Sequence, residues 1–226
     1  MLGDKSTYLV LTPFFPSENS FVGSYIFDQV KEIQNQTNYN IVIVKVVSFF
    51  SKEKDYLYQG FTVNIFKIFD FPFFVFPGIF NKINTNRFKS FILNRNIENI
   101  SISHAHVCYP CSYLQKVLEG KKIIQHHGLD VIQLLNGRSC LIRLIQRKFI
   151  IKNSIKQLNE SDLNIGVSKR VLDELNLFND YVPKDEIVLY NGVDTSKFFP
   201  ISTKINNQFV IGCVANFWEI KDQISL

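Results

Sequence analysis

The chain has 226 residues, of which 46% are hydrophobic and 20% charged, and its formal net charge is +5. This composition excludes a disordered or collagen-like chain, and the modest charge does not favour a nucleic-acid-binding protein, which usually carries a dense basic face. Segment 1–16 lacks a signal-peptide cleavage site, and no apolar run approaches the ~20 residues that cross a bilayer, so we expect a cytoplasmic protein with reduced cysteines.

Strand and helix patterns alternate along the chain. Short apolar or β-branched runs predict strands at 7–12, 40–49, 58–68, 100–107, 121–128, 162–168 and 186–191. Amphipathic patterns predict helices at 21–36, 85–97, 113–119, 139–158 and 169–177, with Ser20 as the cap of the first helix. Repeated strand–helix–strand units predict an α/β fold in which helices cover both faces of a parallel sheet.

The last part of the chain differs from this regular alternation. A polar connector at 201–208 precedes a buried-type strand at 209–217, so we expect one domain over 1–200 and the start of a second over 201–226. The basic amphipathic segment 139–158 is more typical of a helix packed on a sheet than of one lying on an anionic membrane. The Phe-rich segment 66–80 is more typical of a core or a buried loop than of a lipid-facing patch.

The densest group of reactive side chains is HAHVCYPC, which contains His104, His106, Cys108 and Cys111. These residues have the chemistry of zinc ligands. The Cys-x-x-Cys pair between a strand and a helix also suits a thiol redox centre. Structural zinc sites usually draw their ligand pairs from separate elements, however, and the chain is longer than a thioredoxin-like domain. We therefore favour a strand end with incidental thiols over both alternatives.

Two further segments lie where parallel sheets bind ligands. His126-His127-Gly128 follows the predicted strand 121–128 at its carboxyl end, and Asp130 is close enough in sequence to orient an imidazole. Gly23 and Ser24 follow the first strand and open the first helix, a position that suits a phosphate group.

Several segments, in this order, resemble family 4 glycosyltransferases, the retaining GT-B enzymes built from two facing Rossmann-like domains. They are YLVLTPFFPSENSFVGS, HAHVCYP, IIQHHGLD, NIGVSKRV, VANFWEIKDQ and above all VLYNGVDTSKFFP. The resemblance spans nearly the whole chain. It implies that Asn191-Gly192 is not a hairpin turn but leads from an acceptor-binding domain into a linker to the nucleotide-sugar domain.

The resemblance implies a function as well as a fold. Enzymes of this family transfer a sugar from a nucleotide-sugar donor to an acceptor, here a glycan or lipid-linked acceptor in surface polysaccharide or glycolipid synthesis, and they need no bound divalent metal. Peripheral contact with the inner membrane surface is an expected property, and binding of nucleic acid is not. The alternative from another class is a sugar- or nucleotide-binding module without catalysis.

The same resemblance assigns the site residues. His127 falls on the active-site histidine, with Asp130 beside it, and Gly23 and Ser24 face the donor diphosphate. The residues assigned to the acceptor side are His104 and His106. Where the family has an Arg and a Lys that hold the diphosphate from the second domain, this sequence has Asn216 and Lys221. We expect residues 1–226 alone to show little or no transferase activity, because the E-x7-E motif and the nucleotide pocket would lie beyond Leu226.

Overall fold

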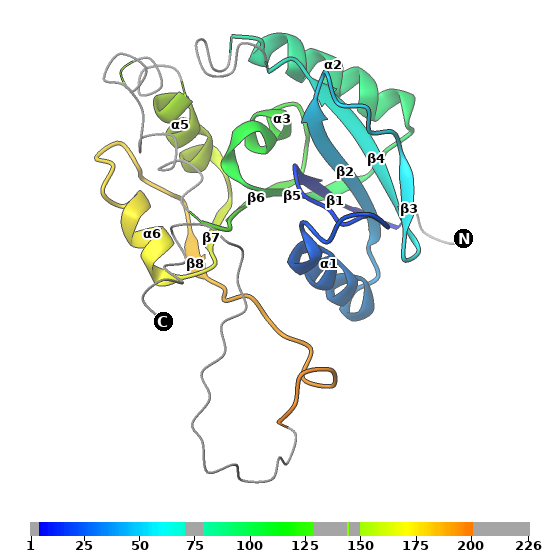
Figure 1. Cartoon of the computed structure of the whole chain (residues 1–226). Coiled ribbons are helices and arrows are strands. Elements are labelled where there is room, and N and C mark those ends of the chain that lie inside the picture. Colours follow the sequence, from blue (N-terminus) through cyan, green and yellow to red (C-terminus); the bar gives the residue numbers. More distant parts are fainter. Residues whose placement is uncertain (1–4, 71–78, 129–143, 145–149, 201–226) are drawn as a thin grey trace. The chain divides into compact units, whose positions relative to one another are not determined.

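The computed structural model describes residues 5–70, 79–128, 144 and 150–200 (Figure 1). The chain divides into two compact units, 1–192 and 193–226. The fold described below is that of the first unit. In the second unit, the described residues form a turn in which the Asp194 carboxylate accepts hydrogen bonds from the backbone N–H and the hydroxyl of Ser196, at 3.0 and 2.6 Å.

Within the described residues, eight strands form one sheet in the order β3-β4-β2-β1-β5-β6-β7-β8. Their bounds are β1 Thr7–Thr12, β2 Asn40–Ser48, β3 Tyr56–Tyr58, β4 Phe61–Ile68, β5 Ile100–His106, β6 Lys121–His126, β7 Leu163–Gly166 and β8 Glu186–Val188. All neighbouring pairs are parallel except β3 and β4. The predicted parallel α/β sheet is therefore confirmed, with one antiparallel strand at its edge.

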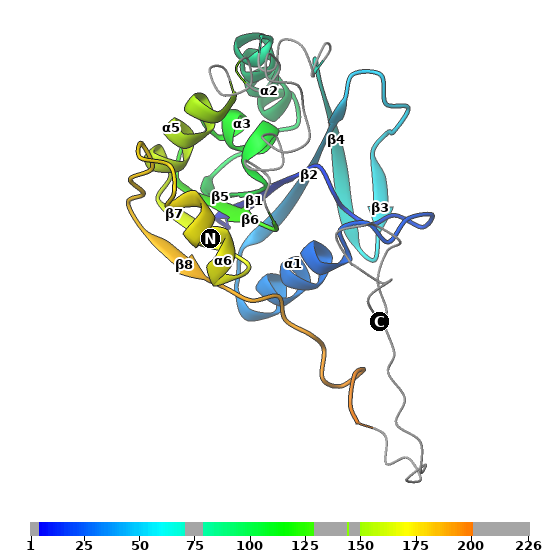
Figure 2. The ribbon, with the colours of Figure 1, turned by 60° about the vertical axis from the view of Figure 1, so that its left-hand side comes forward.

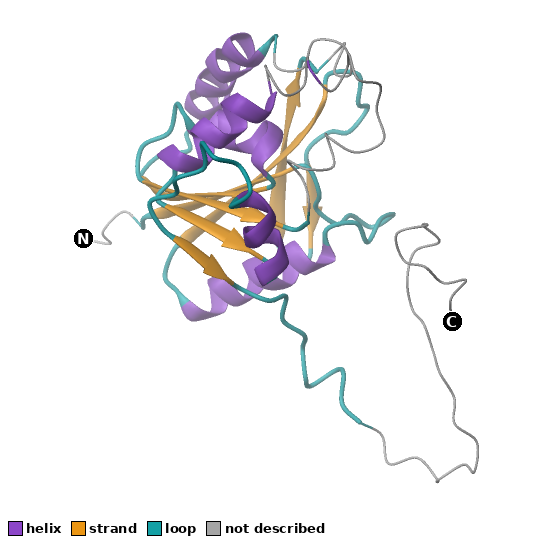
Figure 3. Ribbon diagram, turned by 90° about the vertical axis from the view of Figure 1, so that its left-hand side faces the viewer, coloured by secondary structure: helices purple, strands orange, loops and turns teal. Residues whose placement is uncertain are grey.

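Helices cover both faces of this sheet (Figures 2 and 3). On one face α1 (Ser24–Gln36) packs Ile26, Phe27 and Val30 against β1, β2 and β4. The helices α2 (Asn81–Asn94), α3 (Tyr113–Gln115), α5 (Lys152–Glu160) and α6 (Lys169–Leu175) contribute to a second core on the other face. Each core excludes water from one side of β1, so this strand is buried along its whole length.

The strand order reverses beside β1, which lies between β2 and β5. From β1 the chain passes to α1 on one face, whereas from β5 it passes to a π-helical turn, Cys108–Ser112, and α3 on the other face. The two connections therefore diverge at the carboxyl ends of neighbouring strands. In open α/β sheets, ligands bind at this kind of switch point, which makes this edge the first place to look for a site.

Several local predictions differ from the structure, among them the strand at 186–191, which ends at Val188, and the helix at 85–97, which is Asn81–Asn94. The run 58–68 is not one strand but the end of a hairpin, because Gln59 and Gly60 adopt positive φ values of 45° and 89° and turn the chain between β3 and β4. The first helix begins at Ser24 rather than 21, and its N-cap is Gly23 rather than Ser20. The helix predicted at 113–119 is shorter and follows the π-helical turn.

Two other expectations are only partly covered by the described residues. Most of the helix predicted at 139–158 lies outside them, and the described part is α5, which ends at Glu160. The strand predicted at 209–217 lies wholly outside them. Asn191 and Gly192 belong to no strand, and Gly192 has no positive φ, so they do not form the hairpin turn that Asn-Gly often makes.

Gly23 and Gly60 provide a matched test of what fixes the start of α1. Both have positive φ, 87° and 89°, but a Cβ at Gly23 would lie 2.7 Å from the Phe14 carbonyl carbon and oxygen, whereas one at Gly60 meets nothing within 4 Å. We expect Gly60→Ala to lower the free energy of unfolding by about 1–2 kcal/mol. Gly23→Ala should lower it by a further ~1–3 kcal/mol, because backbone must move. Urea denaturation of both variants measures the difference, and equal losses would contradict the close approach.

Candidate functional site

The loop after β1 is held in place by hydrogen bonds at both ends. The hydroxyl of the fully buried Thr12 donates to the carbonyl oxygen of Phe14 at 2.8 Å and accepts from its N–H at 3.0 Å. The hydroxyl of Tyr56, on β3, donates to the carbonyl oxygen of Phe15 at 3.1 Å. Backbone hydrogen bonds of 2.9 and 3.1 Å join Ser17 to Ser20. The loop therefore has a defined path to the first turn of α1.

The first turn of α1 is positioned by Gly23. Its carbonyl oxygen accepts hydrogen bonds from the N–H groups of Ile26 and Phe27, at 3.0 and 3.2 Å. Within this turn Ser24 is exposed, and the ring of Tyr25 lies 4.7 Å from the ring of His127, centroid to centroid. The N-terminus of a helix favours negative charge because its first N–H groups have no helical partner. The turn therefore brings an anion-attracting helix end to the histidine that follows β6.

Two histidines of β5 point to the same side of the sheet as α1. His104 and His106 are two residues apart, so they share a face, and their rings stack with centroids 4.2 Å apart. Nδ1 of His104 lies 2.7 Å from the hydroxyl oxygen of Tyr8, a β1 residue packed in the α1 core. Both histidines are fully buried. The centre of the sheet thus carries polar rings where an apolar residue would be usual.

His106 connects this buried pair to the edge of the sheet. Its Nδ1 lies 2.8 Å from Nε2 of His127, and the planes of the two rings differ by 14°. A continuous series of aromatic rings therefore runs from Tyr8 in the core, through His104, His106 and His127, to Tyr25 at the start of α1. We call these five residues the ring column.

A second polar contact lies on the same face. The side-chain amide of Gln29, on α1, donates to the side-chain oxygen of the buried Gln125, on β6, at 2.9 Å. His106 and Gln125 are paired residues in the β5–β6 register. The part of α1 that follows the first turn is therefore joined to β6, the strand that pairs with β5 beside the histidines.

Burial keeps the two inner histidines of the ring column uncharged. Removal from water and, to a smaller extent, electrostatic repulsion by His127 together lower the pKa of His104 to about 3, against an opposing effect of Gln125. Burial, followed by repulsion from His104 and His127, holds the pKa of His106 well below its usual value. Burial also raises the pKa of the Tyr8 hydroxyl. At neutral pH these groups act only as neutral hydrogen-bonding partners.

The backbone is strained immediately after His106. Val107 has a φ of 87°, which is unusual for a β-branched residue and costs about 1–3 kcal/mol. Its N–H donates to the carbonyl oxygen of Gln125 at 2.9 Å, so this conformation also continues the pairing with β6. Strain of this kind concentrates at functional sites.

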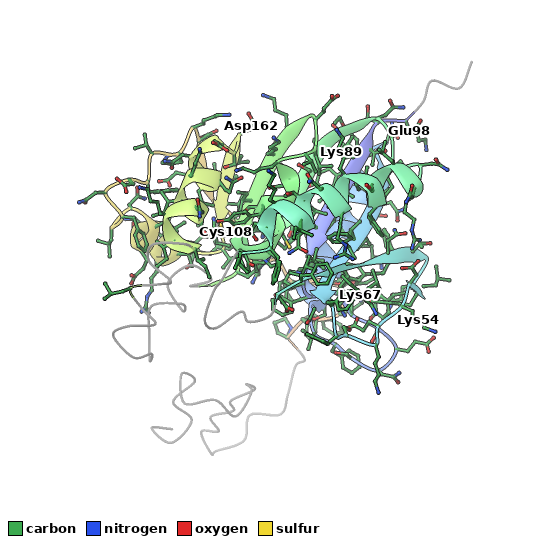
Figure 4. All side chains as sticks on the ribbon, turned by 90° about the horizontal axis from the view of Figure 1, so that it is seen from above. Lys54, Lys67, Lys89, Glu98, Cys108 and Asp162 are labelled. Atoms are coloured by element: carbon green, nitrogen blue, oxygen red, sulfur yellow. The ribbon has the colours of Figure 1, made fainter. Side chains whose placement is uncertain are left out.

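The two cysteines of the same sequence motif lie on the opposite face. Cys108 and Cys111 are fully buried in the core formed by α2, α3, α5 and α6. Sγ of Cys108 is 3.5 Å from the Ser112 hydroxyl and 4.0 Å from the Ser154 carbonyl oxygen. Figure 4 shows Cys108 inside this unit and Lys54 and Glu98 toward its rim. Thiols buried in apolar surroundings are inert, which argues against the redox centre.

The histidines and cysteines of HAHVCYPC occupy different faces of the sheet, so the structure does not bring them together as one set of zinc ligands. Among the residues that the structure describes, no three His, Cys, Asp or Glu side chains are grouped to hold a metal ion. A cavity of about 710 Å³ lies at the far edge of the sheet, at the amino ends of the strands, where Asn99, Ile100 and Ser101 line it. Its lining residues include no histidine.

Of the residues predicted from the sequence, the structure brings His106, His127 and the Gly23-Ser24 turn to one edge. His104 lies deeper, as the buried neighbour of His106. Asp130, Asn216 and Lys221 are outside the described residues. The aromatic residues Tyr8 and Tyr25 were not predicted. The alternation of side chains along β1 could have indicated that Tyr8 faces α1. Nothing in the sequence around Tyr25 indicates that its ring contacts His127, which is about a hundred positions away.

The comparisons with known proteins concern the fold. No protein-family profile and no curated protein sequence matches the chain. Sucrose-phosphate synthase from Thermosynechococcus elongatus is similar in structure, with a TM-score of 0.57 and 11% identity over 87% of this chain and 51% of that chain. The chain thus spans about half the length of that enzyme. The likeness shows a Rossmann-like α/β fold.

Two other solved structures are similar at a lower level. One, from E. coli and described as trehalose-6-phosphate bound with UDP-2-fluoro glucose, has a TM-score of 0.47 and 11% identity over 84% of this chain and 50% of that chain. The other, a UDP-glucose: anthocyanidin 3-O-glucosyltransferase in complex with UDP, has a TM-score of 0.47 and 9% identity over 90% of this chain and 56% of that chain.

In the described part of this chain, none of the helices has the length and apolar character needed to cross a membrane.

The buried histidines predict how stability depends on pH. Their pKa values are lowered in the folded state, so below about pH 6.5 the unfolded chain binds protons that the folded chain does not. We therefore expect the free energy of unfolding to fall as the pH drops from about 6.5 toward 3, by up to about 1.4 kcal/mol per pH unit for each such histidine. Urea denaturation between neutral and moderately acidic pH measures this slope. The slope should be shallower in His104→Leu, and an unchanged slope would show that His104 is not kept neutral.

Proposed function

We propose that this chain is the acceptor-side part of a glycosyltransferase, which transfers a sugar from a nucleotide-sugar donor to a glycan or lipid-linked acceptor. The fold supports this proposal, and so does the order of the motifs that resemble the retaining family 4 enzymes. Surface polysaccharide or glycolipid synthesis, with peripheral contact at the inner membrane, is the setting that the same resemblance suggests. A hexose is the sugar class that we propose for transfer.

The observation that carries the proposal is the contact between Tyr25 and His127, whose ring centroids are 4.7 Å apart. It brings the N-terminus of α1 beside a histidine at the switch point of the sheet. A helix N-terminus stabilises phosphate, whereas an imidazole hydrogen-bonds a hydroxyl group. A nucleotide sugar contains both kinds of group within a few bonds, so one ligand could contact both sides of this edge.

In the proposed arrangement Gly23 and Ser24 contribute backbone N–H groups to the donor diphosphate. We further propose that residues 1–200 form one domain and that 201–226 begin a second one, from which Asn216 and Lys221 reach the same phosphates. Charge that develops on the departing diphosphate is then stabilised by fixed dipoles and a cationic side chain. No divalent metal is needed in this scheme. Asp130 is proposed to orient the imidazole of His127.

The proposal predicts that His127→Ala lowers sugar transfer. We expect kcat/KM to fall by about 100-fold or more, the usual cost of removing a hydrogen-bond donor that acts on developing charge. The assay is turnover of a panel of nucleotide sugars, UDP-glucose included, by the longest natural protein that contains this chain.

Lys121→Ala is the matched control for this measurement. Lys121 begins the same strand, β6, at the opposite edge of the sheet, and its side chain is 75% exposed. It should leave turnover unchanged. Equal activity of His127→Ala and the unsubstituted protein would refute the proposed role of His127. Binding of UDP-glucose without turnover of any donor in the panel would favour a non-catalytic binding module.

A further inference from the structure

Helix α2 has an outer face that combines positive charge with large apolar side chains. Its inner face packs Phe88 and Ile92 into the core that α3 and α5 also form. The exposed residues recur at helical spacing on the opposite face, and they are Lys82, Ile83, Asn86, Lys89, Ser90 and Leu93. Leu93 is 65% exposed and Ile83 47%. Solvent-facing helix surfaces normally carry polar residues, so the apolar members of this face call for a partner.

The charges of this helix all have one sign. Residues 79–95 contain no Asp or Glu, and their charged residues are Lys82, Arg87, Lys89 and Arg95. Arg95 forms an ion pair with Asp55 at 2.6 Å. Within the described residues, Lys82 and Lys89 have no ion-pair partner. The outer face of α2 is therefore positively charged without compensation.

The loop after β2 brings aromatic side chains beside α2. The guanidinium carbon of Arg87 lies 4.5 Å from the ring centroid of Phe69 and 6.0 Å from that of Phe49. The rings of Phe49 and Phe50 have centroids 5.9 Å apart, and Phe50 is 72% exposed. At the start of α2, the ring of Phe80 lies 5.9 Å from the ring of Phe69. The apolar part of the α2 surface thus continues onto this loop.

The same loop adds two more uncompensated lysines. Its acidic residues are engaged, because Glu53 pairs with Lys45 at 2.6 Å and Asp55 pairs with the C-cap arginine of α2. Lys52 and Lys54 are exposed, and neither has an ion-pair partner in the part of the chain that the structure describes. Figure 4 looks onto this side of the unit, with Lys89 on α2 and Lys54 at the rim.

The name basic aromatic face is used below for the exposed residues of this loop and of α2, which are Phe49, Phe50, Lys52, Lys54, Lys82, Ile83, Lys89 and Leu93. Its charge selects between possible occupants. Two copies of the chain that met through this face would bring like charges together, which opposes association. An anionic lipid surface supplies both negative charge and an apolar layer at a depth of a few ångströms.

We propose that the basic aromatic face binds the surface of an anionic lipid bilayer. Phe50, Ile83 and Leu93 enter the boundary between headgroups and acyl chains, while the lysines extend along this boundary to the lipid phosphates. Anionic lipid attracts each lysine near its surface. The inference assigns a surface to the membrane contact in the proposed function and rests on that function for its purpose. The binding itself is measured without any sugar.

The first test is co-sedimentation of the 226-residue chain with two kinds of vesicle. One kind is phosphatidylcholine alone, and the other is an equal mixture of phosphatidylcholine and phosphatidylglycerol. We expect binding to the mixture that is about tenfold or more tighter than binding to phosphatidylcholine, and that weakens as sodium chloride is added because salt screens exposed charges. No binding to the mixture, or equal binding to both kinds of vesicle, would overturn the proposal.

Variants show whether this face is the one that binds. The double variant Lys82→Ala/Lys89→Ala should bind the mixed vesicles less tightly by about fivefold for each lysine. Phe50→Ala should weaken binding by about tenfold, since it removes a ring that enters the apolar layer. These side chains are exposed, so urea denaturation should give the same free energy of unfolding for both variants as for the unsubstituted chain.

Matched controls remove the same groups from elsewhere on the unit. Lys31→Ala/Lys121→Ala removes two exposed lysines, one on α1 across the sheet and one at the start of β6. Leu177→Ala removes an apolar side chain of a residue that is 74% exposed. Both controls should bind as the unsubstituted chain does. Equal losses in the controls and in the variants of the face would show that net charge and general apolarity cause the binding, and would refute the proposal.

The outcomes separate this inference from the proposed function. Vesicle binding that depends on the face, without turnover of any nucleotide sugar, leaves the lipid surface in place and removes the proposed function. Sugar transfer to a soluble acceptor by a protein that ignores anionic vesicles does the reverse. A dimer that light scattering detects, and that Phe50→Ala dissociates without any vesicle binding, would assign the face to a second copy and overturn the proposal.

Discussion

Imidazole rings can be buried in a sheet only if they stay uncharged and find hydrogen-bond partners, and this constraint organises one whole face of the fold. His104 meets it through Tyr8 of the neighbouring strand, and His106 meets it through His127. Tyr8 lies on β1 and His127 directly follows β6, the strands on either side of β5, so the ring column requires that β1, β5 and β6 keep their observed register. The polar interior and the alignment of the sheet therefore depend on each other.

The sequence was sufficient to predict the alternation of strands and helices and the edge of the sheet at which the histidines gather. The two-residue period of a strand indicates that His104, His106 and Cys108 share a face, which is correct for the two histidines and wrong for Cys108, because β5 ends at His106 and Cys108 lies in the opposite core. It could not indicate that His106 bonds to His127, because the two residues are 21 positions apart in the sequence and their contact depends on the register of β5 and β6. The sequence also did not predict that α1 begins at Ser24. The start of this helix is set by the loop after β1, which packs closely against Gly23, and the spacing of apolar residues along a helix carries no information about such a contact.

The motif HAHVCYPC shows why dense clusters of reactive residues are poor guides to a single site. Chain spacing suggests one group of four ligands, yet the strand ends between them. His106 is the last residue of β5, and the chain then turns through Val107 into the opposite layer. The histidines consequently lie on the face of the sheet that α1 covers, while Cys108 and Cys111 pack as small apolar residues in the other core.

The two outer strands of the sheet have different consequences for self-association. β3 is joined to β4 by a tight turn and runs against the direction of the other strands. At the opposite side β8 is only three residues long, from Glu186 to Val188. An edge strand of this length offers few unpaired N–H and C=O groups to a strand of another molecule. Short edge strands are one way in which proteins avoid sheet-to-sheet association. Fibril growth through this side is thereby discouraged, even though the side chain of Ile187 is 42% exposed there.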